Sequence, residues 1–296
     1  MKSNFCADPG EDKKLTFRFE QSLKKGVTPH TVAFFRKIIY DHYEKHRRPF
    51  AWRMTEDPYR ILVSEIMLQQ TQTERVREKY EQFITAFPSF RALARAPLQK
   101  VLSVWQGMGY NRRAIALKEL ADVVVREYKG KLPSTHDELR KLPGVGPYTA
   151  SAIAAFAFNQ PVLLIETNIR TVFIHLFFQD RDEVTDREIL PLIELTLDVA
   201  NPRIWYNALM DYGAMLKKYH QNPGRRSAHY KRQTPFEGSD RQMRGALLKV
   251  IIEHPGISEQ KIIQMVDAPR ERLKQNLNKL REEGFIKRQG RRLTVA

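Results

Sequence analysis

The sequence predicts an all-α body followed by a small C-terminal module of three helices and two short strands. Apolar residues recur three and four positions apart over most of the chain, and glycine and proline separate these periodic segments. No sustained period-two alternation occurs before residue 285. A chain of 296 residues is long enough for one large domain or two ordinary ones.

The helices of the body are expected to follow one another with short breaks. Thr28 is suited to cap the first of them, because Pro29 follows in the first turn. The stretch 58–87 contains a helix with Leu62, Ile66 and Met67 on one face. Further helices are expected at 89–94, 98–104, 110–128, 135–141, 146–158, 166–178, 186–200 and 203–216.

The C-terminal quarter has a different pattern. We interpret residues 1–27 as an N-terminal extension, 28–218 as the body and 219–239 as a basic linker with many turn formers. Helical periodicity returns from residue 240, and two strands that turn at Gln289-Gly290 close the chain. This order predicts a winged helix-turn-helix at 240–296, which would serve either DNA binding or contact with another protein.

Charge points to a polyanionic partner such as nucleic acid. The chain has 50 basic and 34 acidic residues, and 217–296 alone contains 19 basic and 8 acidic ones. The alternative is a solvated basic surface that only aids solubility. There is no apolar run long enough for a membrane span and no apolar N-terminal signal segment, so we expect a cytoplasmic protein, associated with the nucleoid in a bacterium. The single cysteine, Cys6, excludes a disulfide framework and a cysteine-ligated iron–sulfur cluster.

The segment "LPGVGPYTA" (142–150) predicts a hairpin between two helices. Gly144 and Gly146 can take positive φ and bring backbone N–H groups close to a ligand, because neither has a Cβ. Pro147 suits the first turn of the second helix, whose free N–H groups and dipole favour an anion such as a DNA phosphate. The alternative is an ordinary tight connection between helices.

This hairpin and three upstream segments resemble a known family. "LPGVGPYTA" followed by "IETN" (165–168) is similar to the helix-hairpin-helix, Gly/Pro-Asp (HhH-GPD) superfamily of DNA glycosylases. "PFAWR" (49–53), "VSEIMLQQTQ" (63–72) and "WQGMGYNRRA" (105–114) resemble its adenine-mismatch, or MutY, branch. The likeness covers roughly residues 30–218. It implies a two-lobed helical body around a cleft, with the hairpin anchoring the DNA strand.

Two carboxyl groups fit the chemistry of this family. Cleavage of an N-glycosidic bond needs an acid for the leaving base and a negative charge near the cationic sugar. Glu65 lies on the apolar side of its helix, where burial favours a retained proton. The resemblance assigns it to protonation of adenine N7. The alternative is a surface glutamate paired with arginine.

Glu166 matches the family's catalytic aspartate but is one methylene longer. At the head of a helix, the dipole would keep this carboxylate charged, where it would stabilise the sugar cation and help position water. The alternative is a carboxylate that merely caps the helix. Asn168 and Tyr148 match family residues that support this carboxylate. Tyr148 also stands where lyase-active relatives have a Schiff-base lysine, so we expect a monofunctional enzyme.

The resemblance also assigns residues that contact DNA. Extrusion of a stacked base leaves a hole that must be filled. Gln70 and Tyr110 match the wedge residues, and Thr71 matches a residue near the opposite base. The other expected contacts are Trp52 and Arg53 near the base pocket, Arg112 and Arg113 at phosphates, and Gly144, Val145, Gly146, Tyr148 and Thr149 in the hairpin.

Two family features are missing. Most relatives have four cysteines after the segment that matches 208–217 here, and these hold an iron–sulfur cluster, whereas this chain has "KYHQNPGRRSAHYKR". The adenine-mismatch enzymes also carry a Nudix-like β domain that recognises 8-oxoguanine, in place of the winged helix. We expect no metal and no cofactor, with a monovalent cation at the hairpin as the one candidate ion.

Together these features predict a monomeric, monofunctional DNA glycosylase that acts on double-stranded DNA and removes adenine opposite G or 8-oxoG. A thymine or uracil glycosylase for T·G and U·G mismatches is the nearest alternative, because such relatives share the hairpin, the tyrosine and the position of Glu65. A noncatalytic DNA-binding regulator with an inactive glycosylase body is the alternative of another class.

Overall fold

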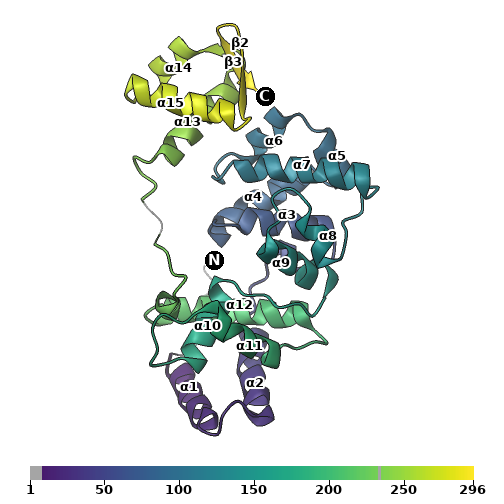
Figure 1. Cartoon of the computed structure of the whole chain (residues 1–296), viewed down its shortest axis with the longest axis vertical. Coiled ribbons are helices and arrows are strands. Elements are labelled where there is room, and N and C mark those ends of the chain that lie inside the picture. Colours follow the sequence, from purple (N-terminus) through teal and green to yellow (C-terminus); the bar gives the residue numbers. More distant parts are fainter. Residues whose placement is uncertain (1–8, 233–234) are drawn as a thin grey trace. The chain divides into compact units, whose positions relative to one another are not determined.

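The computed structural model describes residues 9–232 and 235–296 and is helical nearly throughout (Figure 1). Cys6, the single cysteine of the sequence, lies outside the described residues. The chain divides into two compact units. Unit 1 comprises residues up to 61, 134–136 and 146–232, and unit 2 comprises 62–133, 137–145 and 233–296.

Unit 1 is built around two packed helices, α10 (Thr167–Phe177) and α12 (Pro202–Tyr219). Its core is aromatic, because Phe35 lies edge-on to Phe177 and Trp205 with ring centroids 5.2 and 5.7 Å apart. The remaining elements are α1 (Pro9–Leu23), α2 (Pro29–His46), η1 (Ala51–Arg53), the start of α3 (Pro58–Leu68), α9 (Pro147–Phe158), α11 (Asp186–Thr196) and η2 (Pro223–Arg226).

The segment expected only as an N-terminal extension contributes to this core. Residues 9–23 form α1, and Phe19 is fully buried. Its ring contacts the rings of Phe35 and Phe177 at centroid distances of 5.9 and 5.1 Å. An apolar side chain buried against two others adds to stability, which explains why this segment folds onto the body.

Unit 2 contains most of α3 and the helices that follow it. These are α4 (Thr73–Ala86), α5 (Phe90–Arg95), α6 (Leu98–Trp105), α7 (Arg112–Glu127) and α8 (His136–Arg140). The stretch 58–87, in which the sequence predicts a helix, contains two, because the chain turns at Gln69–Gln72. Gln70 takes the left-handed conformation there, with φ of +53°, and so ends α3.

Residues 240–296 form the expected three helices and two strands, together with a short additional strand. The elements are α13 (Asp240–Glu253), β1 (Ile257–Ser258), α14 (Glu259–Met265), α15 (Arg270–Glu282), β2 (Ile286–Gln289) and β3 (Arg292–Val295). The sheet is antiparallel in the order β1-β3-β2, and Gln289 pairs with Arg292 across the turn. Gly290 in that turn has φ of +61°, a conformation that glycine adopts without strain.

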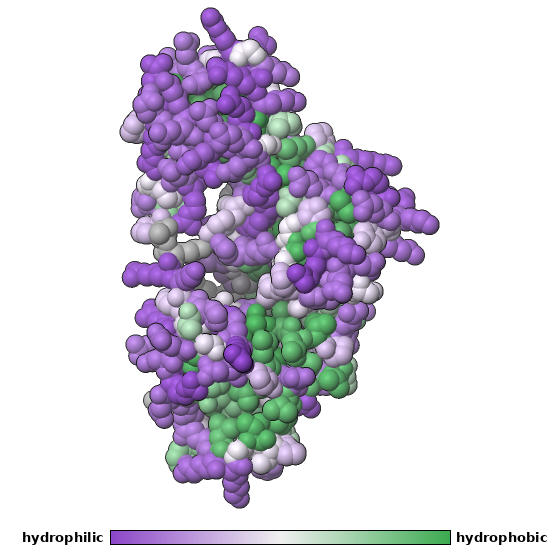
Figure 2. All heavy atoms as spheres, in the orientation of Figure 1, coloured by the Kyte–Doolittle hydropathy of each residue, from purple (hydrophilic) through white to green (hydrophobic). Residues whose placement is uncertain are grey.

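The surface also differs between parts of the chain. Figure 2 shows hydrophobic side chains gathered on one face of unit 1, whereas hydrophilic side chains cover residues 240–296 in this view. The exposed large apolar residues of unit 1 include Leu163, Leu195, Val199 and Ile204. None of the helices in the described ranges has the length and apolar character that a membrane crossing requires.

Candidate active site

Glu166 stands immediately before α10 as its N-cap. Its Oε1 accepts hydrogen bonds from the backbone N–H groups of Asn168 and Ile169, at 2.6 and 3.0 Å. Within the described residues, both of its hydrogen bonds end on Oε1, which leaves Oε2 available. The side chain is half-buried. The N-cap interpretation of this residue is therefore confirmed, and the same geometry leaves one carboxylate oxygen for a reaction.

Asn168 is held from two sides. Its backbone N–H binds Glu166, and its side-chain Oδ1 accepts a hydrogen bond of 2.7 Å from Lys217 on α12. The two helices meet closely here, because a Cβ on Gly213 would lie 2.3 Å from the carbonyl oxygen of Asn168. Glycine at position 213 is thus what permits α12 to approach the N-terminal end of α10.

Glu65 lies in the middle of α3 with only 9% of its surface exposed. Its neighbours Leu62, Ile66 and Met67 are 0–1% exposed, as the helical spacing predicts. Unlike Glu166, it is far from the free N–H groups at the start of its helix, since α3 begins at Pro58. The expected location on the buried face is confirmed.

The hairpin has the expected order of turn and helix start, with one correction. Gly144 has φ of +74°, and a Cβ there would lie 2.9 Å from the Cβ of Ala116. Gly146 does not take positive φ: it is the N-cap of α9 with φ of −84°, and Pro147 follows at the first helical position. A Cβ on Gly146 would meet nothing within 4 Å, so its backbone is open to a ligand. Tyr148 is 41% exposed.

The remaining hairpin residues are buried. Val145 is 6% exposed and Thr149 is 4% exposed. Val145 donates its N–H to the carbonyl oxygen of Leu142 at 3.1 Å. The side chains of these two residues therefore lie in the protein interior, and the Val145 N–H is bound within the turn.

Arg113 connects the two loops of unit 2 that carry the expected wedge residues. Its guanidinium donates to the carbonyl oxygens of Met67 and Gln69 at 2.7 and 2.6 Å and to that of Gly109 at 3.0 Å. It also donates to Thr71 Oγ1 at 2.9 Å. Burial lowers the pKa of Arg113 to about 10. The expected phosphate contact is corrected for this residue, because its donors are directed into the protein.

Gln70 and Tyr110 share an unusual backbone conformation in these loops. Their φ angles are +53° and +47°, values that residues other than glycine rarely adopt. Both side chains are exposed, and Tyr110 is 38% exposed. The Arg113 guanidinium lies 5.5 Å from the Tyr110 ring centroid. One half-buried cation thus contacts both strained positions.

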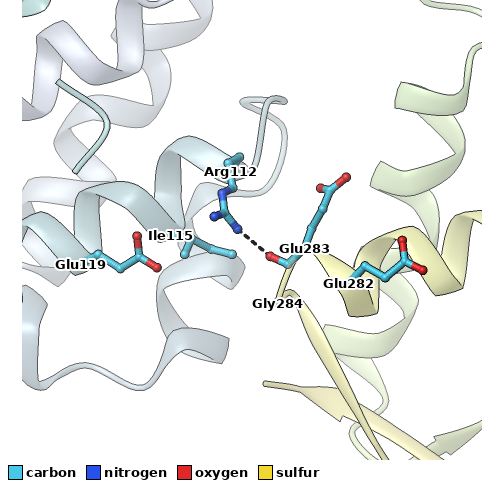
Figure 3. Close-up of a pocket in the computed structure, with 6 residues that line it drawn as sticks. All are labelled: Arg112, Ile115, Glu119, Glu282, Glu283 and Gly284. Atoms are coloured by element: carbon cyan, nitrogen blue, oxygen red, sulfur yellow. Dashed lines mark hydrogen bonds between the residues drawn. The ribbon is translucent and has the colours of Figure 1, made fainter. Parts of the chain in front are cut away.

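Two residues of this region contact the C-terminal module. Tyr110 Oη accepts a hydrogen bond of 2.9 Å from Arg241 at the start of α13. Arg112 Nη1, expected at a phosphate, donates to the carbonyl oxygen of Glu283 at 2.6 Å (Figure 3). The pocket of about 650 Å³ around this bond is also lined by Ile115, Glu119, Glu282 and Gly284. Three glutamates line it, so it does not suit an anionic ligand.

Trp52 and Arg53, expected near the base pocket, are fixed inside unit 1. Trp52 is 6% exposed and stacks on Phe50 with ring centroids 4.8 Å apart. Arg53 Nη1 lies 2.9 Å from both carboxylate oxygens of the buried Asp211. Burial lowers the pKa of Arg53, while the Asp211 charge opposes that shift. Arg53 is thus an internal partner of α12 in this structure.

The segment after α12 has no cysteine and cannot hold a cysteine-ligated cluster. It is ordered instead by Arg226, which donates to the carbonyl oxygens of Phe178 and Gln179 beyond the end of α10, the first at 2.6 Å. Gly224 lies against Thr171, since a Cβ there would come within 2.7 Å of Thr171 Oγ1. An arginine at a helix C-terminus binds carbonyls left without helical partners.

Sequence reasoning missed four residues that organise the site: Asp211, Arg113 as an internal cation, Lys217 and Arg226. The motif "ALMDYGAMLK" contains one signal, because a glycine four residues before a lysine places both on one helix face. For Arg113 and Arg226 there is no such signal. Both stand beside another arginine, and the sequence does not show which guanidinium turns inward.

The comparisons with known proteins agree with this geometry. Residues 63–194 match the family model described as HhH-GPD superfamily base excision DNA repair protein. The chain is 34% identical over 227 residues to an adenine DNA glycosylase of Mycolicibacterium smegmatis, covering 71% of this chain and 77% of that protein. It is 32% identical over 187 residues to an adenine DNA glycosylase of Buchnera aphidicola, covering 63% of this chain and 53% of that protein.

Other relatives are named as thymine or uracil glycosylases. The chain is 30% identical over 185 residues to a thymine/uracil-DNA glycosylase of Methanothermobacter thermautotrophicus, covering 62% of this chain and 84% of that protein. The structure of a thermostable thymine-DNA glycosylase is similar with a TM-score of 0.55 and 29% identity, over 62% of this chain and 86% of that one. The chain spans about half the length of several curated adenine DNA glycosylases that it matches.

Proposed function

The chain belongs to the HhH-GPD superfamily of base excision DNA repair proteins, and on that premise we propose that it is a monofunctional DNA glycosylase that removes mispaired adenine. One observation supports this most directly. Glu166 at the head of α10 is fixed through Oε1 while Oε2 is left available, as a group that stabilises a sugar cation requires.

The proposed reaction divides the charges between two carboxyl groups. The N-glycosidic bond breaks with its electron pair going to the base, and Glu65 donates a proton to a ring nitrogen of that base. Glu166 stabilises the positive charge at the sugar until water adds at C1′ and releases a proton. The buried position of Glu65 favours a proton donor, and the helix start favours an anion at Glu166.

The loops of unit 2 support extrusion of the base. Gln70 and Tyr110 are exposed and conformationally fixed, so they suit insertion into a duplex from which a nucleotide has been withdrawn. The open backbone of Gly146 before α9 suits a phosphate of the same strand. On the C-terminal wing, Lys287 and Arg291 are exposed and suit sequence-independent contacts to duplex DNA.

Adenine is the favoured base because the chain is 34% identical to an adenine DNA glycosylase and covers 77% of that protein. Thymine or uracil opposite guanine is the second candidate, favoured by the thymine/uracil-DNA glycosylase of which the chain covers 84% at 30% identity. The two functions share the cleavage step and differ in the base that is released.

The test is a panel of duplexes containing A·8-oxoG, A·G, T·G, U·G or hypoxanthine, incubated with the full chain and then treated with alkali. We expect strand scission at A·G and A·8-oxoG, only after alkali, with no adduct trapped by borohydride. Scission at T·G and U·G alone would establish the second candidate. Scission of no duplex would contradict glycosylase function and favour a noncatalytic DNA-binding protein.

A further inference from the structure

Lys217 is a half-buried lysine that the proposed reaction does not use. It lies in the last turn of α12, and its ammonium is directed at the start of α10 rather than at solvent. Its neighbour Lys218 is exposed, as lysines usually are. Burying an ammonium group costs free energy unless partners compensate for the lost water, so the environment of Lys217 calls for an explanation.

The position of Lys217 is set by the backbone. Gly213 lies one helical turn earlier on the same face of α12, in close contact with the carbonyl of Asn168. A side chain on the next turn of that face therefore reaches Asn168. The observed hydrogen bond, from Lys217 Nζ to Asn168 Oδ1, is 2.7 Å long.

Asn168 transmits this contact to the carboxylate. Its backbone N–H donates to Glu166 Oε1 at 2.6 Å, while its side chain is held by Lys217. Loss of the lysine would free the asparagine side chain and leave a carbonyl oxygen without its charged donor. A small displacement of the Glu166 carboxylate would follow, and a displacement of ~1 Å can cost about 100-fold in rate.

The Glu166 carboxylate also acts on Lys217 through its charge. Burial lowers the pKa of Lys217, and the negative charge of Glu166 opposes that shift. Arg170 on α10 and Arg48 after α2 are the other charged groups that act on Lys217, and both disfavour its positive charge. Their own partners reduce this effect, because Arg170 binds Asp186 at 2.6 Å and Arg48 binds Asp211 at 2.6 Å.

We propose that Lys217 is a positioning residue for the glycosylase reaction, which holds Asn168 and thereby keeps the Glu166 carboxylate oriented. The proposal rests on the proposed function and adds a residue to it. It does not assign Lys217 to covalent chemistry: its ammonium acts through Asn168.

The test compares Lys217→Met, Lys217→Gln and Lys217→Arg in the full chain, with Lys218→Met as the matched control on the adjacent exposed position. Single-turnover release of adenine from A·G duplex is measured together with thermal unfolding and duplex affinity. Lys217→Gln keeps a hydrogen-bond donor but removes the charge. It also replaces Lys217→Met as the test variant if Lys217→Met folds poorly.

We expect Lys217→Met to lower the rate by about 10- to 100-fold with duplex affinity unchanged. Lys217→Arg should restore most of the lost rate, because it keeps a charged hydrogen-bond donor for Asn168. Lys217→Gln should restore less of it. A merely structural lysine would change thermal unfolding without lowering the rate of the folded protein.

Two results would overturn the proposal separately. If the wild-type protein releases adenine and both Lys217→Met and Lys217→Gln match its rate, Lys217 has no positioning role and the proposed function stands. If the wild-type protein releases no base from any duplex, the proposed function fails, and the role of Lys217 fails with it.

Discussion

Glu65 and Glu166 are the same residue type in opposite local environments. Glu65 sits within α3 on its buried face, whereas Glu166 precedes α10 and accepts two backbone N–H hydrogen bonds. A helix interior has no free N–H group to offer a carboxylate, while a helix start has several together with the positive end of the dipole. The position of a carboxyl along a helix can therefore decide whether it suits donation of a proton or stabilisation of a cation.

The largest effect in this comparison is expected for Glu65→Gln. The amide keeps the size of the side chain and cannot donate an acidic proton, so the single-turnover rate of adenine release should fall by about 10²- to 10⁴-fold. Glu81→Gln is the matched control, because Glu81 is exposed on α4 of the same unit. A rate within twofold of the control would show that Glu65 is not the acid.

Glu166 offers a finer test, because its proposed stabilisation of the sugar cation can be separated from its capping of α10. Glu166→Gln should lower the rate by about 10²-fold through loss of the charge. It should also lower the free energy of unfolding by about 1 kcal/mol, because an amide caps a helix less well than a carboxylate. Glu166→Asp keeps a charged cap and should retain more activity than Glu166→Gln. Equal activity of the two variants would contradict a role for the charge.

Arg113 is expected to have a smaller effect on the reaction and a larger one on stability. Arg113→Met leaves several half-buried carbonyl oxygens without their donor, which should cost about 1–3 kcal/mol of unfolding free energy. The loops carrying Gln70 and Tyr110 would loosen together, so base extrusion should weaken. Fluorescence of 2-aminopurine placed in the mismatch reports extrusion, and thermal unfolding reports stability. Unchanged fluorescence in a folded variant would limit Arg113 to a structural role.

Much of the fold could be predicted from the sequence, because helix starts and ends carry local signals. Thr28 with Pro29, and Gly146 with Pro147, stand at the starts that the structure shows. The break at Gln70 was missed because no glycine or proline marks it: a tertiary contact through Arg113 holds the left-handed turn. Local propensity does not report contacts of this kind.

The candidate site was predicted only where one helix defines a residue's surroundings. Glu65 and Glu166 have the expected burial and N-cap positions, because each follows from its place along one helix. Arg53 and Arg113 have internal partners on other segments, and those partners depend on packing between helices. The role of Gly213 likewise became visible only with α10 and α12 in contact.

The most direct measurement of the central claim is single-turnover release of free adenine from an A·G duplex by the wild-type protein and by the Glu65→Gln/Glu166→Gln double variant. We expect release by the wild-type protein and none above the uncatalysed background by the double variant, at equal duplex affinity. Release by the double variant at the wild-type rate, or none by either protein, would contradict the division of charge between these two carboxyl groups.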